Sequence, residues 1–281
     1  MEPLVFAAVL AAAAMHAGWN SFLKVSLEPF LAMTLVSAMA GVAAVPLLIA
    51  FGWPKAEAWP WLIGSLVTHL AYYGALSEAY RRADMSQIYP IARGGAPLLT
   101  AVASRFFVTE PISATALAGI AALGSGVALM SVLGRRRGAA FDGVAVAFAL
   151  LTAVIICSYT IIDGIGARAA GDPHAYAAAL FVLDAIPLPL VALWRRGAAG
   201  LRPAMQYLKP GLAGGAMALG SYWIAIWAMT VAPIALVAAL RESSVLWAAL
   251  IAVVFLKEPM LPPRAVAAAM ILCGLVLIRA G

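Results

Sequence analysis

Apolar runs of about 20 residues follow one another along almost the whole chain, and this feature decides the class of fold. A helix of that length matches the hydrocarbon core of a bilayer, which is roughly 30 Å thick. The composition agrees, because 65% of the residues are hydrophobic and 11% are charged. In soluble domains about 45–50% of the residues are hydrophobic and about 25% are charged. The sequence therefore predicts an all-α integral membrane protein.

Ten such runs can be counted, with turn or breaker residues between them. We expect transmembrane helices at 3–24, 30–51, 60–81, 85–108, 112–133, 142–166, 175–194, 208–230, 233–256 and 261–279. The first run has no basic segment before it and no small-residue cleavage site after it, so we expect a retained helix and not a signal peptide. Because the connections are short, functional residues must lie within the bundle or on short loops.

The two halves of the chain repeat each other at a spacing of 148 residues. Arg93 recurs as Arg241, and Glu110-Pro111 recurs as Glu258-Pro259, both 148 positions later. Five helices per half is an odd number, so the halves must cross the membrane in opposite directions. This is the inverted-repeat design of secondary transporters, whose binding site lies near the midplane. We expect the first repeat at 1–138 and the second at 139–281.

The positive charges are unevenly divided between the two faces that these spans predict. Twelve Lys and Arg residues fall on the face opposite the termini, and four fall on the face that holds the termini. The positive-inside rule then places the termini outside the cytoplasm. The net charge of +6 reflects Lys and Arg at helix ends, and it gives no argument for nucleic-acid binding.

The helix count, the duplicated half and the Glu-Pro that ends each fourth helix resemble the drug/metabolite transporter superfamily, EamA type. The 16–20 element, His-Ala-Gly-Trp-Asn followed by Lys24, is similar to the Trp-Asn and Lys of that family's first helix. The 89–94 stretch resembles one branch of the family, some members of which accompany phosphonate-use genes. The resemblance implies a multi-pass protein of the bacterial inner membrane, with export as the default direction. It also implies a cavity lined by helices one, three, four, six, eight and nine. Finally, it implies termini in the cytoplasm; here it disagrees with the charge count, and we adopt the family's orientation.

Arg93 and Arg241 are the most unusual residues of the apolar runs. An arginine at the centre of a span costs about 2.5–3.5 kcal/mol on insertion scales, and such residues usually face a bundle interior or a wet cavity. Arg93 could hold a carboxylate or phosphonate with two hydrogen bonds. The alternative is a structural ion pair with Glu78, Asp163 or Glu242. Two prolines and two glycines around Arg93 predict a locally weakened helix.

Other polar and aromatic residues of the spans complete the candidate site. The substrate-binding candidates are Trp19, Asn20, Tyr73, Tyr89, Arg93, Tyr159, Tyr222, Trp223, Arg241 and Ser244. The candidates for proton coupling are Asp163, Asp184, Glu242 and His16. For each there is a structural alternative: helix–helix hydrogen bonds, aromatic packing, or a place at the membrane interface.

These residues favour a secondary transporter for a small polar or zwitterionic metabolite, such as an amino acid or aminophosphonate, working by alternating access. An exporter of lipophilic cations is the main alternative, and two intramembrane arginines argue against it. An intramembrane enzyme using His16 or His69 as base, or a membrane scaffold, are further alternatives. We expect no enzymatic activity, no cofactor and no metal, because the sequence has no phosphate loop, no metal-ligand spacing and no catalytic set. The expected partners are a small-molecule substrate, the lipid bilayer and a second copy of the chain.

Overall fold

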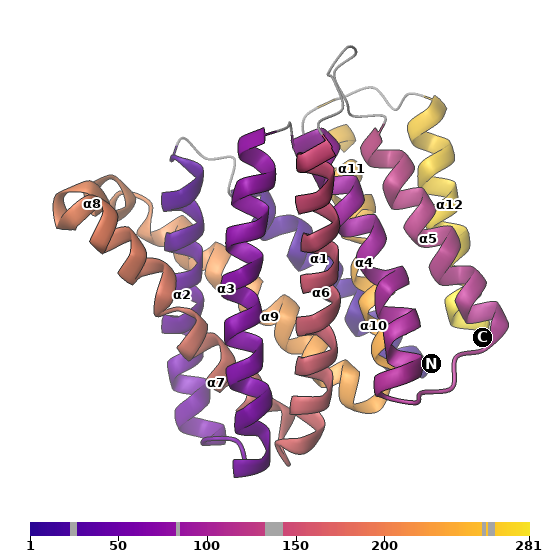
Figure 1. The fold of residues 1–281 in the computed structure, drawn as a ribbon, viewed down its shortest axis with the longest axis horizontal. Helices are drawn as coiled ribbons and strands as arrows, with labels where there is room; N and C mark the ends of the chain where they lie inside the picture. The colour runs from indigo at the N-terminus through magenta and orange to yellow at the C-terminus, as the bar shows by residue number, and fades with distance from the viewer. Residues whose placement is uncertain (23–26, 83–84, 133–142, 255–256, 258–261) are drawn as a thin grey trace.

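The computed structural model describes residues 1–22, 27–82, 85–132, 143–254, 257 and 262–281. This part of the chain is all-helical (Figure 1). Its elements are α1 (Pro3–Phe22), α2 (Pro29–Phe51), a 3₁₀ turn η1 (Ala56–Ala58), α3 (Trp59–Arg82), α4 (Met85–Phe107), α5 (Ala114–Val132), α6 (Gly143–Ala169), α7 (Pro173–Asp184), α8 (Pro187–Met205), α9 (Leu208–Val231), α10 (Ile234–Arg241), α11 (Ser244–Val254) and α12 (Pro262–Ala280).

Seven segments of the described chain are long and apolar enough to cross a membrane, if α7–α8 and α10–α11 each count as one segment. α5 is a shorter apolar helix over Ala114–Met130. α3 and α4 have 24 and 23 residues, which is long enough, but they carry more polar side chains. Polar side chains need partners inside the protein when lipid surrounds it. These ten segments correspond to the ten predicted spans, and the fold is an all-helical membrane bundle.

Two predicted helices are each broken into two in the structure. The predicted 175–194 helix ends as α7 at Asp184 and restarts as α8 at Pro187. The proline explains this break, because it has no N–H to continue the ladder of hydrogen bonds. The predicted 233–256 helix ends as α10 at Arg241 and restarts as α11 at Ser244. No proline or glycine lies at this second break, so the local sequence did not predict it.

The expected weakening of the helix around Arg93 is absent, because α4 is continuous from Met85 to Phe107. The two glycines serve packing instead. A Cβ atom on Gly94 would lie 3.3 Å from the carbonyl oxygen of Gly124 on α5, and one on Gly95 would lie 3.6 Å from Ala153 on α6. α4 can therefore lie close to both neighbours.

The internal repeat is visible in the backbone conformation of equivalent residues. The backbone takes the left-handed conformation at Thr109 (φ 55°) and at Lys257 (φ 54°), again 148 residues apart. Each of these residues directly precedes a Glu-Pro pair. The predicted boundary between 138 and 139, Lys24 and Glu258-Pro259 lie outside the described residues.

α5 and α12 pack against each other as antiparallel equivalents. A Cβ on Gly126 would lie 2.9 Å from the carbonyl oxygen of Ala267. A Cβ on Gly274 would lie 2.7 Å from the carbonyl oxygen of Gly119. Gly126 corresponds to Gly274 in the repeat and Gly119 to Ala267, so the two contacts are the same contact seen from either half. A pseudo-twofold axis passes between these helices, as an inverted repeat requires.

Both chain ends lie on the same face of the bundle, at the lower right of Figure 1. We call this face, with the connections 52–58, 108–113 and 170–172, the termini face. The backbone N–H of Lys55 donates to the carbonyl of Ala170 there, at 3.2 Å. The guanidinium of Arg279 donates to the carbonyl of Met1 at 3.0 Å. The first and last helices are thus held together at their ends.

Candidate functional site

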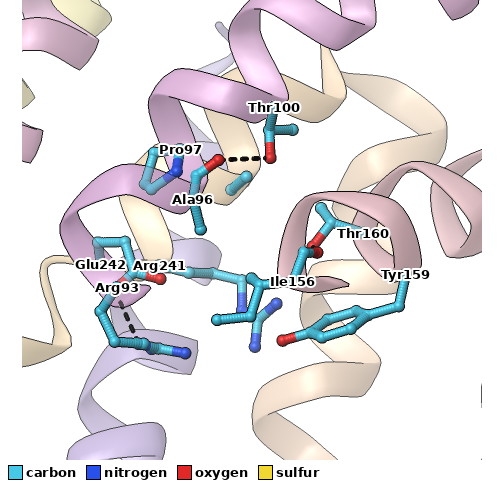
Figure 2. A pocket seen from close by; sticks show the side chains of 10 residues that line it. Arg93, Ala96, Pro97, Thr100, Ile156, Tyr159, Thr160, Arg241 and Glu242 are labelled. Atoms are coloured by element: carbon cyan, nitrogen blue, oxygen red, sulfur yellow. Dashed lines mark hydrogen bonds and ion pairs between the residues drawn. The ribbon is translucent and has the colours of Figure 1, made fainter. Parts of the chain in front are cut away.

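A small pocket lies between three helices in the middle of the bundle (Figure 2). α4 and α10 come from equivalent positions of the two repeats, and α6 closes the third side. The lining residues are Arg93, Ala96, Pro97, Thr100, Ile156, Tyr159, Thr160, Ala238, Arg241 and Glu242. The repeat therefore brings its two intramembrane arginines into one pocket.

Arg93 is buried, with 8% of its surface exposed. Its Nε atom lies 3.0 Å from Oε2 of Glu242, which forms an ion pair between the two repeats. Its Nη2 atom lies 3.2 Å from Nε2 of His16 on α1. Of the three acids that the sequence suggested as structural partners of Arg93, the structure pairs it with Glu242. The ion pair does not exclude substrate binding, because the arginine still lines the pocket.

His16 is approached by hydrogen-bond donors on both ring nitrogens. Nε1 of Trp19 lies 3.3 Å from Nδ1 of His16, and the Arg93 guanidinium lies beside Nε2. A neutral imidazole has one acceptor nitrogen, so it accepts from only one of these donors at a time. A second proton on the ring would face a donor on both sides. This geometry does not favour His16 as the proton carrier.

Arg241 has no carboxylate within ion-pair distance among the described residues. Its Cζ atom lies 4.5 Å from the centroid of the Tyr222 ring. Such stacking is worth roughly 0.5–2 kcal/mol, but it satisfies no N–H group. The Nε atom of Arg241 is buried and has no hydrogen-bond partner among the described residues. A partly buried guanidinium in this state is a site where an anion would be stabilised.

The break between α10 and α11 lies at the pocket. The N–H of Glu242 donates to the carbonyl of Ala239, and that of Ser243 donates to Leu240, at 3.0 and 3.1 Å. These i to i−3 hydrogen bonds tighten the helix into a single 3₁₀-like turn. Such a turn inside a helix often marks a hinge. It also presents Arg241 and Glu242 to the pocket from successive positions.

Asp163 is fully buried on α6 and is held by two tyrosines. The hydroxyl of Tyr176 on α7 donates to one carboxylate oxygen at 3.0 Å. The hydroxyl of Tyr222 on α9 donates to the other oxygen. Tyr222 therefore connects two groups, since its ring lies under Arg241 and its hydroxyl holds Asp163.

His69 and Asp184 form a second acid–base pair near this cluster. Nδ1 of His69 on α3 lies 3.4 Å from Oδ1 of Asp184 at the end of α7. The His69 ring packs edge-on against Tyr159, with centroids 4.7 Å apart. The rings of Tyr72 and Tyr73, on the same helix, have their centroids 5.6 Å apart. His69 and Tyr72 of α3 thus face Tyr159 of α6.

Of the ten predicted binding residues, Arg93, Tyr159 and Arg241 line the pocket. The other seven do not line it or cannot be placed. Trp19, Tyr73 and Tyr222 make the contacts described above, and four residues remain. The Trp223 ring N–H donates to His174 at 2.7 Å, and the Asn20 amide donates to the carbonyl of His16 within its own helix. Ser244 is buried at the start of α11 and does not line the pocket. The side chain of Tyr89 lies outside the described residues.

A cluster at the termini face was not anticipated. Arg168 pairs with Glu110 and donates to the carbonyl of Met229 at 2.8 Å. The other oxygen of Glu110 accepts the N–H of Ile234, the first residue of α10, at 2.9 Å. The Glu-Pro pair was visible in the sequence only as a repeat signature. Its role as a helix cap depends on a residue 124 positions away in the chain.

Residues 143–280 match the model of the EamA-like transporter family. The chain belongs to this family. A solved crystal structure of a protein, 18% identical in sequence, covers 99% of this chain and 99% of its own, with a TM-score of 0.79. At that identity the likeness shows the fold alone, and it extends over both repeats. No curated protein matches the chain.

Membership makes this EamA-like protein a membrane transporter and not an enzyme. The superfamily resemblance inferred from the sequence is confirmed. The described residues contain no group of three or more His, Cys, Asp or Glu placed to hold a metal ion.

Proposed function

We propose that this protein is a secondary-active transporter for a small metabolite that carries an anionic group, such as an amino acid or an aminophosphonate. The carboxylate or phosphonate binds between Arg93 and Arg241, and the two repeats move about this pocket by alternating access. Export from a bacterial cytoplasm across the inner membrane is the direction that the family resemblance implies.

The state of Arg241 carries this proposal. The pocket holds two guanidinium groups and one carboxylate, and that carboxylate pairs with Arg93. One positive charge thus remains without a carboxylate among the described residues. A lipophilic cation would be repelled by the same arrangement.

Purified protein in proteoliposomes tests the proposal against a panel of amino acids, aminophosphonates and tetraphenylphosphonium. We expect Arg241→Ala to weaken binding of the accepted anion about ten- to hundredfold, the equivalent of a charged hydrogen bond. Arg241→Lys keeps the charge but not the paired geometry, and is expected to recover part of the affinity.

Arg82→Ala is the matched control. Arg82 also sits on a helix of the first repeat, but it pairs with Glu78 on its own helix at 2.8 Å and is exposed. Its loss should leave the affinity unchanged. Selective transport of tetraphenylphosphonium, or equal affinity in the Arg241→Ala protein, would reject the proposal.

A further inference from the structure

Glu242 occupies the place that a substrate anion would need on Arg93. Its Oε2 atom lies 3.0 Å from Nε of Arg93, and the same oxygen makes no hydrogen bond with the part of the chain that the structure describes. Glu242 is 5% exposed, so water can stabilise its charge only slightly. The Arg93 guanidinium is therefore the main group that stabilises this carboxylate.

An anion that binds both arginines would compete with Glu242 for the Arg93 guanidinium. A carboxylate that loses its cation inside a protein is strongly destabilised unless it becomes neutral. The simplest way to become neutral is to take up a proton. The incoming anion then replaces the charge that Glu242 gives up, and the net charge of the pocket stays the same.

We propose that Glu242 is the coupling carboxylate, which releases Arg93 to the substrate's anionic group and binds one proton as the substrate binds. This inference rests on the proposed function, because it requires an anion at Arg93 and Arg241. The proton comes from water on the open side of the membrane. It is released there or on the other side when the anion leaves and the Arg93–Glu242 ion pair forms again.

The groups around Glu242 support this role. Arg93 on α4 and Arg241 on α10 are the charged groups that act on it most directly. Tyr159 on α6 lines the same pocket, and His16 on α1 contacts Arg93 from the other side. The sequences of α5 and α11 contain no titratable side chain. An anion that displaces Glu242 from Arg93 would leave it no second cation except Arg241, which the same anion occupies.

The other two buried acids have partners that a substrate at the arginines would not displace. Asp163 accepts two tyrosine hydroxyls. Asp184 lies beside His69, which can carry a compensating proton. Both acids therefore supply matched controls, because neither contacts Arg93.

Proton uptake on anion binding tests the inference. The probes are methanesulfonate and trifluoroacetate, a tetrahedral and a planar monoanion that stay ionised over the working pH range. Binding to the purified full chain is measured by calorimetry in two buffers that differ in ionisation enthalpy, which gives the number of protons taken up. We expect about one proton per anion in the wild type, and an affinity that falls about tenfold per pH unit on the alkaline side.

Glu242→Gln should bind the anions with no proton uptake and no pH dependence, whereas Asp163→Asn and Asp184→Asn should resemble the wild type. Since Glu242→Gln leaves Arg93 buried without a carboxylate, the double variant Arg93→Gln with Glu242→Gln is measured as well. It removes both charges, keeps Arg241, and should also bind without a proton.

The outcomes separate the two proposals. Binding that depends on Arg241 but takes up no proton in the wild type overturns the coupling role of Glu242 and leaves the proposed function standing. Proton uptake that persists in both Glu242 variants also overturns it. Failure of both anions to bind rejects the proposed function and this inference together. If the coupling holds, an inward proton gradient drives uptake, so export requires an outward gradient of the substrate itself.

Discussion

Tyr222→Phe separates the two roles that the structure gives to Tyr222. The substitution keeps the aromatic face under Arg241, 4.5 Å from its Cζ atom, and removes the hydroxyl that donates to Asp163. Asp163 is fully buried, so water cannot replace the lost donor. A hydrogen bond to a charged group contributes about 1.5–3 kcal/mol. We expect the free energy of unfolding to fall by that amount, and the affinity for an anion at Arg241 to stay within about twofold of the wild type.

Steric trapping in lipid bicelles measures the free energy of unfolding, and calorimetry with methanesulfonate measures the affinity. Tyr176→Phe is the matched control for stability, because Tyr176 donates to the other oxygen of Asp163 at 3.0 Å and no arginine of the described residues lies over its ring. A loss below about 0.5 kcal/mol in both variants would show that Asp163 is not held as a carboxylate. A large loss of anion affinity in Tyr222→Phe would mean that the hydroxyl, and not only the ring, belongs to the binding site.

Two further substitutions test the frame around the site. Gly274→Ala places a methyl group 2.7 Å from a backbone carbonyl of α5 and should destabilise the protein by about 1–3 kcal/mol. Gly74→Ala meets nothing within 4 Å and should be neutral or slightly stabilising; equal effects in steric trapping would refute the close α5–α12 packing. Glu110→Gln removes the charge paired with Arg168 and the carboxylate that caps α10. We expect a loss of about 1–3 kcal/mol and faster hydrogen exchange at the start of α10, and unchanged exchange there would contradict the capping role.

Much of the fold could be predicted because lipid leaves few solutions. The sequence predicted the spans from their length. It also predicted that Arg93 and Arg241 are equivalent in the repeat, as are the two Glu-Pro pairs. The left-handed backbone at Thr109 and Lys257 and the reciprocal glycine contacts between α5 and α12 agree with the register of the repeat. The helix breaks were harder to predict. Pro187 signals the first break, but the tight turn at Glu242-Ser243 has no proline or glycine to announce it.

The composition of the site was predictable only in part. Arg93, Tyr159, Arg241 and Glu242 line the pocket, and a charged or polar group in an apolar run is easily recognised. Trp223 shows the limit of this reasoning, because its ring N–H donates to His174 and it does not line the pocket. A period of four residues shows which side chains share a face, but it cannot show which neighbour that face meets.

The sequence by itself determined that this chain is a membrane bundle built from two inverted halves, because backbone groups in lipid must be satisfied within helices. It also determined that two arginines occupy equivalent places in those halves. Only the tertiary structure decided how their charges are used. Packing of α4, α6 and α10 brings both guanidinium groups to one pocket. There the carboxylate of Glu242 forms an ion pair with Arg93. Arg241 is left on the ring of Tyr222, because ion pairing depends on distances of a few ångströms across helices that lie far apart in the chain.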